Sequence, residues 1–167
     1  MQDVLGYSGD EAALFYMIGS FFGPVTGVVF GGIVVSVCGG YNSKKGQLAM
    51  TYFAVCALIC ILPLPFVTRK AFFGPGVFGL LFFGGAMVPT CTGIMLNTVP
   101  EDLRTSANSL AMIIYNFGGY LPAPVFYGTI SKLVNDPTSR IPFSALMVTG
   151  FIPMTLLFTN IRAKVAK

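Results

Sequence analysis

The run Ala12–Ser43 reads AALFYMIGSFFGPVTGVVFGGIVVSVCGGYNS and contains no charged side chain. It is longer than the roughly 20 apolar residues that an α-helix needs to cross the hydrocarbon core of a bilayer. Four more uncharged runs follow: Gly46–Thr68, Ala71–Pro100, Thr105–Ser131 and Ile141–Ile161. All 10 basic and 6 acidic residues lie outside these runs. A water-soluble protein would spread its charges over its helix surfaces, so this segregation predicts a membrane protein.

The composition supports an all-α polytopic membrane protein with five transmembrane helices. The chain is 54% hydrophobic and only 10% charged, against about 25% charged residues in an ordinary soluble domain. The runs are continuously apolar rather than alternating, which excludes a membrane β-barrel. We expect one transmembrane domain over residues 1–167, in which the five helices cover approximately 12–38, 47–67, 72–98, 104–132 and 141–162.

The side chains that usually carry catalysis or bind metals form no recognisable set. Cys38, Cys56, Cys60 and Cys91 all lie in apolar runs, without a CxxC pair, and the chain has no histidine. Metal sites need further ligands beside thiolates. We therefore expect ordinary membrane-helix cysteines, no metal, no cofactor, no catalytic residues and no enzymatic activity. The net charge of +4 is explained by the loops between helices, so no nucleic-acid partner is expected.

The distribution of lysine and arginine predicts the orientation, because cytoplasmic loops are enriched in these residues. With five helices, one side of the membrane receives Lys44, Lys45, Arg104, Arg162, Lys164 and Lys167. The other side receives Arg69, Lys70, Lys132 and Arg140, together with the acidic amino terminus. We expect a multi-pass integral membrane protein with its carboxyl terminus on the cytoplasmic (or matrix) side.

Four glycines recur at four-residue spacing in the first run: Gly19, Gly23, Gly27 and Gly31. Glycines at this spacing share one helix face and let another backbone approach closely, as in tandem GxxxG motifs of membrane helices. One interpretation is a face that slides or rocks against a partner helix during transport. The other is a static packing seam, and spacing alone leaves both open.

A polar stripe marks the fourth run. Asn108, Met112, Tyr115 and Gly119 fall on one helix face, with Asn116 beside them. Asn and Tyr are retained within a membrane where they line a wet cavity or find hydrogen-bond partners. These five residues are therefore candidates for a substrate path, and interhelical hydrogen bonding is the alternative.

Two connecting segments resemble signature loops of the major facilitator superfamily of transporters. Gly27–Gly32, leading into Gly39-Gly40-Tyr41-Asn42-Ser43-Lys44-Lys45, resembles the end of helix eight and the basic loop that follows it. Val99–Ala107 resembles the loop before helix eleven in the spinster-like and organic-anion-transporter-like branches, and Gly118–Pro124 continues that match. The signature positions are Gly32, Lys44, Lys45, Pro100, Glu101 and Arg104. Where the family carries an Asp four residues after its first glycine, this chain has Ser36.

The second signature segment also suggests local roles. Pro100 should end the preceding helix, and Asp102 should cap the amino end of the next. Arg104 should pair with Glu101 or with anionic lipid.

The resemblance implies helices eight to twelve of a fold that consists of two six-helix halves with the substrate between them. The implied function is the carboxyl-terminal part of a facilitator-type transporter for a small organic solute, anion or lipid-like substrate, incomplete on its own. Its expected partners are the lipid bilayer and other transmembrane helices, from the missing amino-terminal half or from partner subunits. The alternative is a transporter-derived, non-transporting structural subunit of a larger assembly. The glycine face and the lack of charge within the helices favour that alternative.

Overall fold

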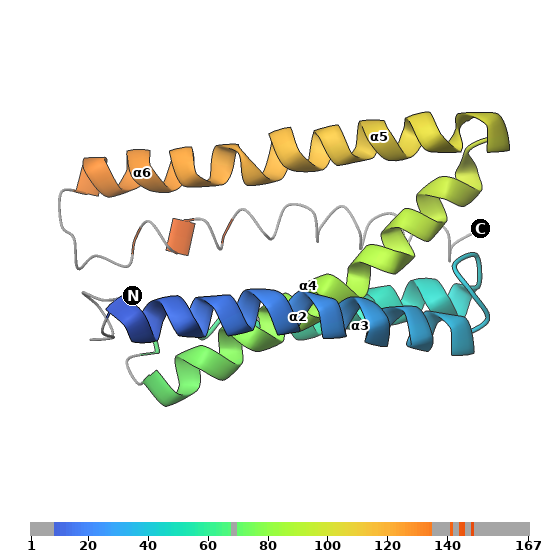
Figure 1. The fold of residues 1–167 in the computed structure, drawn as a ribbon. Helices are drawn as coiled ribbons and strands as arrows, with labels where there is room; N and C mark the ends of the chain where they lie inside the picture. Colours follow the sequence, from blue (N-terminus) through green and yellow to red (C-terminus); the bar gives the residue numbers. More distant parts are fainter. Residues whose placement is uncertain (1–8, 68–69, 135–140, 142–143, 146–147, 149–167) are drawn as a thin grey trace.

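The computed structural model describes residues 9–67, 70–134, 141, 144–145 and 148, and this part of the chain is helical without any strand (Figure 1). Its main elements in chain order are α2 (Gly9–Val37), α3 (Lys44–Ile61), α4 (Lys70–Thr98), the 3₁₀ turn η1 (Glu101–Leu103), α5 (Arg104–Tyr115), the π-helical turn η2 (Asn116–Tyr120) and α6 (Pro122–Val134). The predicted all-α fold class is confirmed for these residues.

Three of the described helices are long and apolar enough to cross a membrane, where the sequence predicts five. They comprise Ala13–Val37 in α2, Lys44–Ile61 in α3 and Phe72–Thr98 in α4. Many large apolar side chains on their outer faces are exposed, among them Phe21 at 64% and Tyr52 at 63%. Such a surface is unfavourable in water and suits contact with lipid. The fifth predicted helix, 141–162, lies largely outside the described residues.

The fourth predicted helix, 104–132, is not one unbroken α-helix. A π-helical turn separates α5, of 12 residues, from α6, of 13 residues, although Figure 1 shows both running in nearly the same direction. In this turn the Leu121 amide donates to the Asn116 carbonyl at 2.9 Å, one residue farther back than in an α-helix. Pro122 follows at once, and a proline ring clashes with the carbonyl four residues before it, so the regular pattern cannot continue.

Helix α4 is the centre of the packing. It packs extensively against both α2 and α3, whereas α2 and α3 touch each other much less. Ala49 and Phe53 of α3 form a buried cluster with Ala86 of α4. The ring of Phe30 in α2 joins them, with its centroid 5.8 Å from that of Phe53 and 5.3 Å from that of Phe82. The core of the described chain therefore lies along α4.

A tight loop joins α2 to α3. Gly39 and Gly40 have positive φ angles of 95° and 84°, which side chains rarely tolerate. The Gly40 amide donates to the Val35 carbonyl at 2.9 Å, and Gly39 donates to Ser36 at 3.2 Å. This pattern is a Schellman cap, which satisfies carbonyls at the carboxyl end of a helix.

Ser43 starts α3 earlier than the sequence predicts. Its hydroxyl oxygen accepts a hydrogen bond from the Gly46 amide at 2.9 Å, so Lys44 and Lys45 belong to the first helical turn rather than to the loop. The helix also ends at Ile61 and not at residue 67, because Pro63 and Pro65 follow. The predicted range 47–67 is therefore corrected at both ends.

Candidate functional site

The predicted glycine face of α2 lies against α4 for three of its four residues. A Cβ built on Gly27 would meet the Phe82 carbonyl oxygen, and one on Gly31 would meet the Ala86 carbonyl. A Cβ on Gly23 would lie 2.9 Å from the Leu81 Cβ. The two backbones are so close that no side chain fits between them.

A glycine of α4 also packs directly against the backbone of α2. Gly85 of α4 faces Pro24 of α2, and a Cβ at Gly85 would lie 2.6 Å from the Pro24 carbonyl oxygen. Small residues on both helices therefore allow the contact, as expected where membrane helices associate by close packing.

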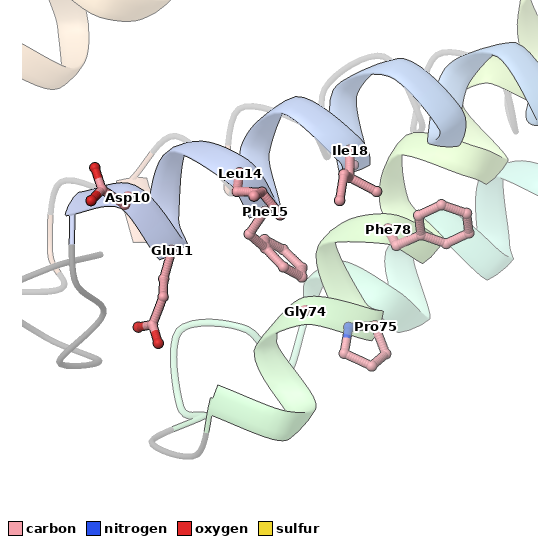
Figure 2. Close-up of a pocket in the computed structure, with 9 residues that line it drawn as sticks. Asp10, Glu11, Leu14, Phe15, Ile18, Gly74, Pro75 and Phe78 are labelled. Carbon is pink, nitrogen blue, oxygen red and sulfur yellow. The ribbon is translucent and has the colours of Figure 1, made fainter.

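Gly19 lies where the two helices diverge, and nothing occupies the space within 4 Å of a Cβ built there. It borders an open hollow of about 850 Å³ between the beginnings of α2 and α4. Figure 2 shows the rings of Phe15 and Phe78 along this hollow, with the carboxylates of Asp10 and Glu11 at its amino-terminal end. The hollow is apolar apart from this acidic end.

A second cleft, of about 340 Å³, lies between α4 and α5. From α5 it is lined by Asn108, Ala111, Met112 and Tyr115. Three of the five predicted substrate-path residues, Asn108, Met112 and Tyr115, thus share one cavity. Its volume falls within the range of about 300–1,000 Å³ that is typical of small-ligand sites.

The α4 wall of this cleft consists of Met87, Val88, Cys91, Thr92 and Met95. Sequence reasoning did not include this wall among the site residues. Met87, Cys91 and Met95 follow one another at four-residue spacing, so they share one face of α4. The sequence therefore indicates that these three residues share a helix face, but it does not indicate which helix lies opposite.

Of the remaining two predicted path residues, Asn116 is not among the residues that line the cleft. Asn116 is exposed, and its amide nitrogen donates to the Met112 carbonyl of its own helix at 2.7 Å. The surroundings of Gly119 lie outside what the structure describes. Asn116 begins the π-helical turn, and turns of this kind often occur at functional sites.

The two signature segments lie at the same end of the helical packing, as Figure 1 shows for the α2–α3 and α4–α5 connections. Lys44 and Lys45 are exposed there, whereas Gly32 lies five residues before the end of α2, and nothing lies within 4 Å of a Cβ built on it. The predicted pairing of Arg104 with Glu101 is confirmed, at 3.3 Å between Nη1 and Oε1.

The predicted cap by Asp102 is wrong. Glu101–Leu103 form a 3₁₀ turn, and α5 begins at Arg104 after Leu103, without a side-chain cap. Pro100 precedes this turn and lies outside α4, which ends at Thr98. The turn uses backbone hydrogen bonds such as Leu103 to Pro100, at 3.1 Å, in place of a side-chain acceptor.

The α4–α5 cleft combines a few polar groups with a largely apolar lining. Asn108, Thr92 and Tyr115 contribute hydrogen-bonding groups, and the rest is aliphatic or sulfur-containing. No group of three or more His, Cys, Asp or Glu side chains gathers in the part of the chain that the structure describes. No family model, curated protein or solved structure matched this chain in comparison.

Proposed function

We propose that this chain is an integral membrane protein that forms part of a facilitator-type transporter, with the α4–α5 cleft on the path of a small solute. The observation that carries the proposal is the convergence of Asn108, Met112 and Tyr115 with Thr92 in one cavity. Polar groups within a membrane-spanning bundle are costly unless they serve a cavity or find partners. The resemblance to facilitator transporters suggests an organic solute, an anion or a lipid-like molecule. An anion is the least suited of these, because no cationic residue lines the cleft among the described residues.

The proposed orientation places the carboxyl terminus on the cytoplasmic (or matrix) side. In support, the connection that carries Lys44 and Lys45 and the connection that carries Arg104 lie at the same end of the packing (Figure 1). The five-helix count is part of the same proposal, with α5, η2 and α6 together forming the fourth span.

The competing proposal is a transporter-derived structural subunit that transports nothing. The seam between α2 and α4 favours it, because carbonyls packed directly against Gly27 and Gly31 leave little room for sliding. Under this proposal the cleft is filled by a side chain of a partner helix.

Cysteine accessibility tests the cleft. In a variant whose native cysteines are replaced by serine, Asn108→Cys should react with a membrane-impermeant thiol reagent from one side of sealed vesicles. Leu110→Cys is the matched control, because Leu110 lies on the same helix, is 58% exposed and does not line the cleft. Equal and slow labelling at both positions would exclude an aqueous path.

A second measurement separates the two proposals. An antibody against the segment that joins α2 to α3 and the first turn of α3, residues 39–45, should detect the native protein, whose mass and co-purifying partners are then determined. The transporter proposal expects one polypeptide near three times 17.8 kDa. A species of 17.8 kDa in fixed stoichiometry with other membrane subunits would support the structural role instead.

A further inference from the structure

Sulfur atoms gather around the α4–α5 cleft. Met87, Cys91 and Met95 line it from α4, and Met112 lines it from α5. Behind them, the Cys91 thiol donates to the Met50 sulfur of α3 at 3.9 Å. Four of the eight methionines and one of the four cysteines thus meet at one place.

The arrangement suits binding of an ion between the two walls. The three α4 residues follow each other at one-turn intervals, so Cys91 has a thioether on either side. Met112 approaches from the opposite helix. Methionine side chains are unbranched and flexible, so their sulfur atoms can converge within a cleft of about 340 Å³. Cys91 is exposed as a residue and lines the cleft.

The chemistry of the donors selects the ion. Thiolate and thioether sulfur are soft ligands that prefer Cu(I), whereas Ca²⁺ and Mg²⁺ prefer oxygen. One thiolate also neutralises one positive charge, so a monovalent ion leaves a neutral complex. A divalent ion would leave an uncompensated charge in a low-dielectric cleft, which is costly. No carboxylate lines the cleft among the described residues, and the chain has no histidine.

We propose that the α4–α5 cleft binds one soft monovalent metal ion, Cu(I) or its analogue Ag(I), through the Cys91 thiolate and the thioethers of Met87, Met95 and Met112. Binding replaces the thiol proton: Cys91–SH and M⁺ become Cys91–S–M and H⁺, without any change in oxidation state. Transport of the ion rests on the proposed function, with the ion as the substrate in place of the organic solute that the resemblance suggests. Binding of the ion depends on the cleft alone.

The test uses the full chain purified in detergent micelles, with Cu(I) kept reduced by ascorbate and a chromophoric Cu(I) chelator as competitor. We expect one Cu(I) per chain, release of one proton in weakly buffered solution, and an all-sulfur first shell by X-ray absorption. Ag(I) should compete with Cu(I), and Zn²⁺ should not. Cys91→Ser should weaken binding by on the order of 100-fold or more, since even outer-shell changes reach that range.

Further variants keep the test independent of folding. Met112→Leu conserves volume and should weaken binding while leaving the helix content unchanged. Cys91→Met retains a soft sulfur without its charge, so it should bind Cu(I) more weakly and release no proton. The matched controls are Cys56→Ser and Met17→Leu, at positions that do not line the cleft, and both should bind as the parent protein does.

Three results would overturn the assignment: unchanged affinity in Cys91→Ser, loss of binding in Cys56→Ser, or Zn²⁺ bound as tightly as Cu(I). These outcomes are distinct from failure of the proposed function. Metal binding in micelles is measured without transport, and labelling of Asn108→Cys is measured without metal.

Discussion

Arg104 donates its Nε–H to the carbonyl oxygen of Leu96 at 3.0 Å, across the turn that joins α4 to α5. In a continuing helix this carbonyl would accept from the amide of residue 100. That residue is Pro100, which has no amide hydrogen. The side chain of Arg104 thus takes the place of the donor that the proline lacks, and it links the end of α4 to the start of α5.

Arg104→Ala should therefore loosen the last turn of α4. A hydrogen bond of this kind contributes about 1 kcal/mol, so amide hydrogen exchange near Leu96 should become severalfold faster. Glu101→Gln is the control: it removes only an exposed ion pair, in which the Glu101 side chain is 87% accessible, and such pairs contribute roughly 0–1 kcal/mol. If Glu101→Gln had the larger effect, the ion pair would be holding the turn, and not the bond to Leu96.

Two adjacent glycines in α2 allow a direct test of the close packing between α2 and α4. A Cβ at Gly31 would lie 2.7 Å from the Ala86 Cα, whereas one at Gly32 meets nothing within 4 Å. Alanine is the better helix former at both positions. Gly32→Ala should therefore be neutral or stabilising, while Gly31→Ala should lower the free energy of unfolding by about 1–3 kcal/mol through overpacking. The free energy of unfolding of both variants can be measured in detergent. Equal effects at the two positions would argue against the close approach of α2 and α4.

The cap at Ser43 predicts a substitution pattern at the start of α3. Ser43→Ala removes the acceptor for the Gly46 amide and should cost about 1 kcal/mol, the usual cost of losing an N-cap. Ser43→Asn retains an acceptor oxygen and should keep most of the stability. The comparison uses thermal unfolding followed by circular dichroism. An alanine variant as stable as the asparagine variant would show that the lysine-containing first turn forms without the cap.

The arrangement of the connections predicts the location of inserted tags. A tag after Asn42 and a tag between Glu101 and Asp102 should be accessible from the same side of sealed vesicles, because both connections lie at one end of the packing (Figure 1). A tag after Phe66, between α3 and α4, should be accessible from the opposite side. Detection of the first two tags on different sides would contradict the proposed membrane topology.

The sequence alone predicted the helical class and the approximate places of α2, α3 and α4. Charge segregation is a local property of the chain, because a charged side chain is costly in hydrocarbon wherever the helix packs. The connection at Gly39 and Gly40 was predicted from its resemblance to a signature loop, and the structure adds that both glycines have positive φ, which other residues rarely adopt.

Other features depended on contacts between distant residues. Four-residue spacing marked Gly23, Gly27 and Gly31 as a packing face, but only the fold shows that Phe82 and Ala86 of α4 lie against it. The sequence likewise showed Met112 and Tyr115 on one face of a helix without showing Cys91 across from them. Helical periodicity specifies which residues share a face, and it carries no information about which helix lies opposite. That pairing is decided by the packing of whole helices, here around α4, so the cleft and its sulfur atoms became visible only in three dimensions.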